Sequence, residues 1–149
     1  MATFQSTPAE VLPAQTAAAG CPLEVVVVHS TTKATLHALR TAAELATGLH
    51  ARIRLVVPQI VPYPRPLSSP TVSAAFNERR LRTIASGVPI ETRIEVCLCR
   101  DRWQLMESAL RPHSLVVLSG RLRWWPTAEQ RAARRLQRLG HQVVFSSFE

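Results

Sequence analysis

Aspartate and lysine are almost missing from this chain of 149 residues, and cysteine and glycine are scarce. Asp101 is the only aspartate, which argues against carboxylate-rich metal sites and against phosphoryl-transfer centres that need clustered aspartates. The three cysteines, Cys21, Cys97 and Cys99, are an odd number without the spacing of a disulfide framework. They predict reduced thiols in a cytoplasmic protein.

Long apolar runs are also missing. No stretch reaches the length of a membrane span, so we expect no membrane partner. No lysine or arginine precedes Lys33, and the N-terminus has no continuous apolar segment, so we expect no secretory signal there. Residues 1–22 are rich in Ala, Thr and Pro, which predicts a disordered tail before one domain at residues 23–149.

What the chain has in excess is arginine: seventeen, with a net charge of +8. Arginine suits bidentate contacts to phosphate, so a polyanion partner is one interpretation. The other is that an arginine-rich codon usage simply places guanidinium groups in solvent. Both interpretations stay open at this point.

The N-terminal half of the domain indicates a strand, a helix and a second strand. The run Val25–Val28 is typical of a buried parallel strand, and Ser30 to Thr32 are good helix N-cap residues. Small and apolar residues at helical spacing follow up to residue 49, and residues 51–57 alternate as a strand. Residues 58–70 hold five prolines and predict a surface loop.

The rest of the chain repeats this order. We expect a helix over 71–85 with Val72, Ala75, Phe76 and Ile84 inward, then a strand over 89–99 in which the two nearby cysteines are small core residues. Asp101 starts a third helix, and residues 114–119 form the fourth strand. Thr127 and Gln130 predict a capping box on a fourth helix, before a last strand over 142–148. This alternation predicts an α/β fold, a three-layer α/β/α sandwich with a five-stranded parallel sheet.

Several stretches together resemble the universal stress protein family over residues 23–148. The first helix carries the pattern Ala-Leu-x-x-Ala-Ala-Glu-Leu-Ala-x-x-Leu over residues 38–49, and Ala51 follows. The Val57-Pro58 strand end, the proline-rich loop and the strand at 114–120 also match. The resemblance implies an adenine nucleotide alpha hydrolase-like fold with strand order 3-2-1-4-5. It also implies a homodimer joined through the last strand, here at Val143 and Phe145.

The family's ATP-binding pattern is incomplete in this chain. ATP-binding members carry an acidic residue after the first strand, where this chain has His29-Ser30, and the pattern Gly-x2-Gly-x9-Gly-Ser/Thr after the fourth. Only Gly120, or Ser119 in another register, matches the first glycine, and Thr127 caps the helix before the spacer is complete. The residues that would bind a nucleotide are His29, Ser30, Val57, Ser119, Gly120, Arg121, Arg123 and Thr127.

Without these glycines the loop cannot approach a triphosphate closely, so we expect a degenerate site with no cofactor. An ATP or ADP site in which arginine charge compensates is the alternative. Trp124 and Trp125 are interpreted either as a base or partner platform or, in our preferred interpretation, as a cover for the sheet end. The histidines show no metal spacing, and no set of residues indicates catalysis.

The predicted function is therefore a universal-stress-protein-like regulatory or interaction module that is not an enzyme. Two alternatives remain: an adenine-nucleotide sensor, and a nucleic-acid binder. The second would use four arginines that share one face of the fourth helix, Arg131, Arg134, Arg135 and Arg138. A solvated helix face is the simpler interpretation of these arginines.

Overall fold

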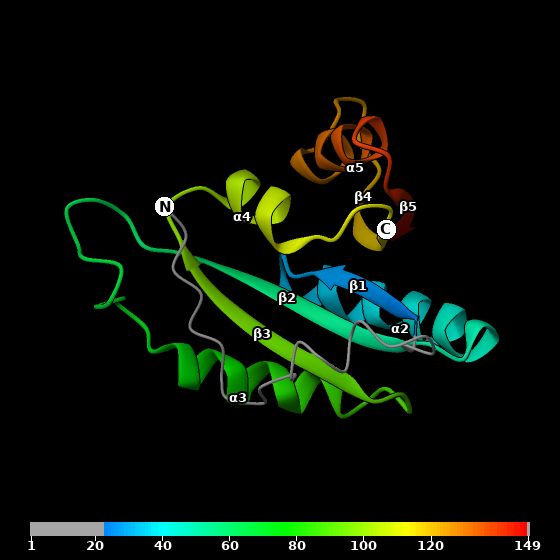
Figure 1. Cartoon of the computed structure of the whole chain (residues 1–149), viewed down its shortest axis with the longest axis horizontal. Helices are drawn as coiled ribbons and strands as arrows, with labels where there is room; N and C mark the ends of the chain where they lie inside the picture. The colour runs from blue at the N-terminus through cyan, green and yellow to red at the C-terminus, as the bar shows by residue number, and fades with distance from the viewer. Residues whose placement is uncertain (1–22, 149) are drawn as a thin grey trace.

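The computed structural model describes residues 23–148, which form a five-stranded parallel sheet with two helices on each face (Figure 1). The expected tail and Cys21 lie outside the described residues. In chain order the elements are β1 (Glu24–Val28), α2 (Thr32–Leu49), β2 (Arg52–Ile60), α3 (Ala74–Ala85), β3 (Thr92–Cys99), α4 (Arg102–Ala109), β4 (Leu115–Arg121), α5 (Ala128–Arg138) and β5 (Gln142–Phe148). The strand order β3-β2-β1-β4-β5 confirms the predicted fold class.

The central strand β1 explains why the valine run contains no polar residue. Val25 and Val27 face the core beneath α2 and α3, whereas Val26 and Val28 face the core beneath α4 and α5. All four side chains are buried, and each contributes roughly 1.5 kcal/mol of apolar burial. Because β1 pairs with both β2 and β4, it lies at the middle of the sheet.

The second strand is longer than predicted. The proline-rich loop was expected to begin at Pro58, but β2 continues to Ile60, and Pro58 pairs with Cys97 of β3. The pairing of β1 with β2 stops at Val28 and Val56, so beyond that point β2 has a neighbour on one side only. A proline is tolerated there because its missing N–H can lie on the unpaired side.

The buried face of α3 was predicted wrongly except at Ile84, which packs against the core. Val72 and Phe76 are 42% and 52% exposed, Ala75 is exposed as well, and the buried residues include Leu81 and Ala85. The helix begins after the N-cap Ser73, whose hydroxyl accepts a hydrogen bond from the Phe76 N–H at 3.1 Å. Val72 therefore precedes the helix, and in the first turn Ala74 packs against the core whereas Phe76 is exposed.

The helix caps and core cysteines on the other face confirm the predictions. Asp101 caps α4 by accepting from the Trp103 N–H at 2.8 Å. Thr127 caps α5 in a complete capping box with Gln130. Cys97 and Cys99 are buried under α4 as free thiols, and burial raises the pKa of both. In the described part of the chain, no helix is both long and apolar enough to cross a membrane.

Candidate functional site

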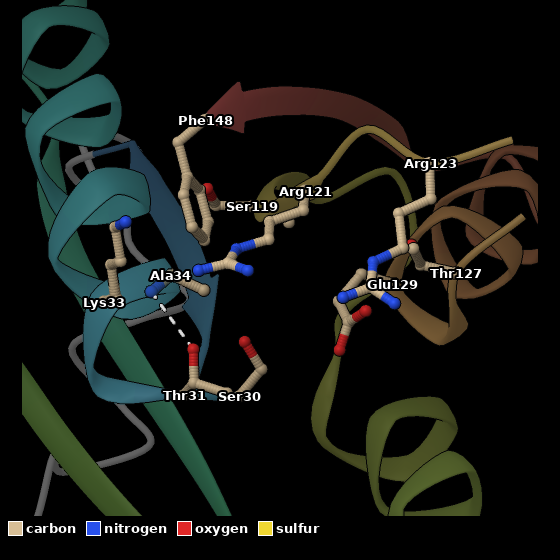
Figure 2. Close-up of a pocket in the computed structure, with 11 residues that line it drawn as sticks. Ser30, Thr31, Lys33, Ala34, Ser119, Arg121, Arg123, Thr127, Glu129 and Phe148 are labelled. Atoms are coloured by element: carbon tan, nitrogen blue, oxygen red, sulfur yellow. Dashed lines mark hydrogen bonds between the residues drawn. The ribbon is translucent and has the colours of Figure 1, made fainter.

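A pocket of about 410 Å³ lies at the carboxyl edge of the sheet, between the ends of β1 and β4 (Figure 2). The chain leaves β1 towards α2 on one face of the sheet and leaves β4 towards α5 on the other. Such a switch point is where open α/β sheets bind ligands. The residues that line the pocket are Ser30, Thr31, Lys33, Ala34, Ser119, Gly120, Arg121, Arg123, Thr127, Glu129 and Phe148.

Two helix N-termini border this pocket. Thr31 caps α2 by accepting from the Ala34 N–H at 3.2 Å, and Thr127 caps α5 by accepting from the Gln130 N–H at 3.2 Å. The partial positive charge at the start of each helix favours an anion. In both caps the threonine hydroxyl already accepts a hydrogen bond from a backbone N–H, so these two donors and acceptors have partners within the chain.

Three cationic side chains line the pocket, with a single carboxylate. Figure 2 shows the Arg121 side chain extending into the pocket towards the β1–α2 turn. Lys33, from the first turn of α2, has its ammonium 5.2 Å from the ring centroid of Phe148. The carboxylate of Glu129 lies 3.9 Å from the guanidinium of Arg102. Because Arg102 partly neutralises this carboxylate, Glu129 offsets less of the positive charge of the three cationic side chains. The pocket is therefore suited to an anion.

Ser119 and Gly120 serve the packing of the sheet. The Ser119 hydroxyl donates to the backbone oxygen of Ser146 at 2.8 Å, across the β4–β5 pair. A Cβ on Gly120 would lie 3.3 Å from Cζ of Phe145 and 3.4 Å from Cβ of Glu129. The one glycine of the expected phosphate loop thus lies where a side chain would crowd a neighbouring ring.

His29 and Val57 do not line the pocket. Val57 is buried in the core beneath α2 and α3. His29 is half-buried, with Nδ1 2.7 Å from the Thr35 hydroxyl. Burial, together with the positive charges of Arg80 and Arg102, lowers the pKa of His29 to about 4. The other six predicted residues, Ser30, Ser119, Gly120, Arg121, Arg123 and Thr127, come together here, and their role towards a ligand stays a prediction.

Sequence reasoning missed Lys33, Phe148 and Arg102. Lys33 had a local signal, because it follows the N-cap of the helix after the first strand. Phe148 had none, because it reaches the site only through the β4–β5 register, in which Arg121 pairs with Phe148. Arg102 had none either; it donates to the His29 backbone oxygen at 3.3 Å and so connects α4 to the end of β1.

The preferred interpretation of the tryptophans was wrong. Trp124 is 100% exposed and Trp125 is 81% exposed, so neither covers the end of the sheet. The predicted arginine face of α5 is exposed, and one of its members, Arg135, stacks over the Trp103 ring at 4.1 Å. Among residues 23–148, no group of three histidine, cysteine or acidic side chains is placed to hold a metal ion.

Comparison with solved structures identifies the fold. A universal stress protein from Archaeoglobus fulgidus matches this chain with a TM-score of 0.59 and 12% sequence identity. The match covers 83% of this chain and 92% of that protein. A universal stress protein family member from Burkholderia pseudomallei gives a TM-score of 0.53 at 20% identity, over 87% of this chain and 98% of that one. A universal stress protein in complex with cAMP gives a TM-score of 0.53 at 12% identity, over 86% and 98%.

At the level of sequence no relative was found. No family model and no curated protein matches the chain. The identities to the solved structures are low, so the likeness is one of fold: the chain has the fold of the universal stress proteins.

Proposed function

We propose that this chain is a non-catalytic regulatory or interaction module with the universal stress protein fold, acting in the cytoplasm in a stress response. Its pocket does not bind ATP in the mode in which glycines wrap the phosphates. The observation that carries this proposal is the packing around Gly120. A Cβ at this position would crowd Phe145 and Glu129, so the glycine fits the packing of the sheet, and no further glycine follows before α5 begins.

The side chains after Gly120 support the same conclusion. Arg121 extends into the space between β1 and β4, where a wrapped triphosphate would need the backbone to approach (Figure 2). Only six residues, 122–127, separate β4 from α5. A loop this short, carrying bulky side chains, cannot form the extended phosphate cradle of the family pattern.

Calorimetry with ATP tests the proposal, with phosphate release measured in the same samples. We expect no saturable heat at millimolar ATP with magnesium and no phosphate release above the rate of buffer alone. Stoichiometric ATP binding that survives Arg121→Ala and Arg123→Ala would contradict the proposal, because binding would then not depend on the basic side chains.

A second candidate function, an adenine-nucleotide sensor with a divergent site, is favoured by the charge of the pocket. Lys33, Arg121 and Arg123 converge on a volume of about 410 Å³, within the range of small-molecule sites. A ligand with fewer phosphates needs less backbone wrapping than ATP, and one neighbour in fold was solved in complex with cAMP. The titrations should therefore include ADP and cAMP.

The sensor predicts a thermal shift with one of these nucleotides. The shift should disappear in Lys33→Ala/Arg121→Ala. It should persist in Arg79→Ala, a control at an exposed arginine of α3 that does not line the pocket. No shift at millimolar ADP or cAMP would remove this candidate.

The module is further proposed to be a homodimer joined through β5. This strand pairs only with β4 in the described sheet, so its outer edge offers unpaired backbone groups. Val143 and Phe145 pack against the core beneath α4 and α5, which holds the edge in place for a second copy.

A further inference from the structure

The loop after β4 leads directly into α5, and five exposed residues of these two segments line neither the core nor the pocket. We call them together the Trp–Arg surface, which is defined by Trp124, Trp125, Arg131, Arg134 and Arg138. The two indoles are 100% and 81% exposed, and the three arginines are exposed as well. A fully exposed tryptophan leaves a large apolar face in water, which is the usual property of a contact surface.

The charge of this region is positive and hardly compensated. Glu129 is the only acidic residue between Glu107 and Glu149 in the sequence. Its carboxylate faces the pocket and Arg102, away from the solvent face of α5. The partner that fits the Trp–Arg surface is therefore anionic.

The arrangement of the arginines favours a polymeric anion. Arg131, Arg134 and Arg138 lie on the side of α5 opposite the buried Ala133 and Leu136. Over seven residues an α-helix rises about 10 Å, so the guanidinium groups follow a line along the helix. A chain of phosphates can track such a line, starting next to the tryptophans at the N-terminal end of α5.

The tryptophans favour a partner that carries flat rings. Nucleic-acid bases stack on exposed aromatic side chains without regard to sequence, and only unpaired bases have their faces free to do so. A lipid bilayer would also accept indoles, but an interfacial helix inserts its apolar face, and the apolar face of α5, with Ala133 and Leu136, is buried in the core. We propose that the Trp–Arg surface binds single-stranded nucleic acid, with bases on Trp124 and Trp125 and phosphates along α5.

Fluorescence anisotropy with a labelled single-stranded oligouridine tests this inference on the full chain. We expect binding that weakens with salt, because phosphate contacts release counterions, and weaker binding to a duplex of the same length. Trp124→Ala/Trp125→Ala should weaken binding about tenfold or more through lost stacking. Arg134→Glu/Arg138→Glu should weaken it further and reduce its dependence on salt.

A matched control separates the effect of this surface on binding from the effect of the overall net charge of the chain. Arg40→Glu/Arg79→Glu changes the net charge by the same amount, at exposed positions of α2 and α3 on the opposite face of the sheet. It should retain most of the binding. All substituted side chains are exposed, and circular dichroism verifies that each variant folds.

Three results would overturn the inference. The first is no binding to the oligonucleotide at low salt. The second is equal loss in the control and the Arg134→Glu/Arg138→Glu variant, or unchanged binding without the tryptophans. The third is tight binding to vesicles that contain anionic lipid, lost in Trp124→Ala/Trp125→Ala, while oligouridine does not bind; this result would assign the surface to a membrane.

Discussion

At Gly120 the absence of a side chain leaves room for the ring of Phe145. We expect Gly120→Val to destabilise the fold by about 1–3 kcal/mol, since a branched side chain would overpack against Phe145 and Glu129. Gly48→Ala is the control, because a Cβ there meets nothing within 4 Å and the helix gains up to about 1 kcal/mol. Urea unfolding measures both. A Gly120→Val variant as stable as the original chain would show that β4 and β5 adjust freely.

His29 couples the stability of the fold to pH. Its pKa in the folded chain is about 4, below the ordinary value of 6.5, so between these values the unfolded chain binds more protons. The contribution of His29 to stability is therefore complete above about pH 6.5 and is lost as the pH falls towards 4. The full pKa difference corresponds to about 3 kcal/mol, and solvent screening of the half-buried ring reduces the expected loss to about 2 kcal/mol. Urea midpoints across this range should fall less steeply in His29→Gln. Parallel pH profiles for the two chains would contradict this assignment.

At the scale of a single element, α5 depends on its capping box. Thr127 accepts from the Gln130 N–H, and the Gln130 side chain accepts from the Thr127 N–H at 2.9 Å. Thr127→Ala should cost about 1 kcal/mol of unfolding free energy, because it leaves a helix donor without its partner. Thr32→Ala is the control: this exposed threonine follows the N-cap of α2, and its loss should change stability by less than about 0.5 kcal/mol.

The hydrogen bonds between elements also show how a charged strand residue is accommodated in a partly buried place. Arg54 of β2 donates to Glu95 of β3 at 2.7 and 2.9 Å and to the backbone oxygen of Ala109 at the end of α4 at 2.9 Å. The sequence shows Arg54 as the polar side of an alternating strand. Its partners are 41 and 55 residues away, so they follow from the fold and not from the local pattern.

At the scale of the whole molecule, the open edge of β5 predicts the association state. We expect light scattering to give a dimer mass at tens of micromolar, because a second copy would pair its β5 with this edge. Ser147→Lys places a charge at an exposed position of the edge strand and should shift the chain towards the monomer. A strict monomer for the original chain would contradict the proposed dimer.

The sequence by itself determined the order of elements and the caps of α4 and α5, whereas the strand order was expected from the family resemblance. The element order and the caps depend on contacts within a few residues, such as Thr127 with Gln130, or on an unbroken run such as Val25–Val28. It also located the carboxyl edge where Arg121 and Arg123 line the pocket.

Only the tertiary structure decided the remainder, because it depends on residues far apart in the chain. The extension of β2 through Pro58 follows from the end of β1, and Phe148 enters the pocket through its pairing with Arg121. The exposure of Trp124 and Trp125 could not be read from the sequence, since an apolar side chain is buried only where another element covers it. In the described chain nothing covers these two rings.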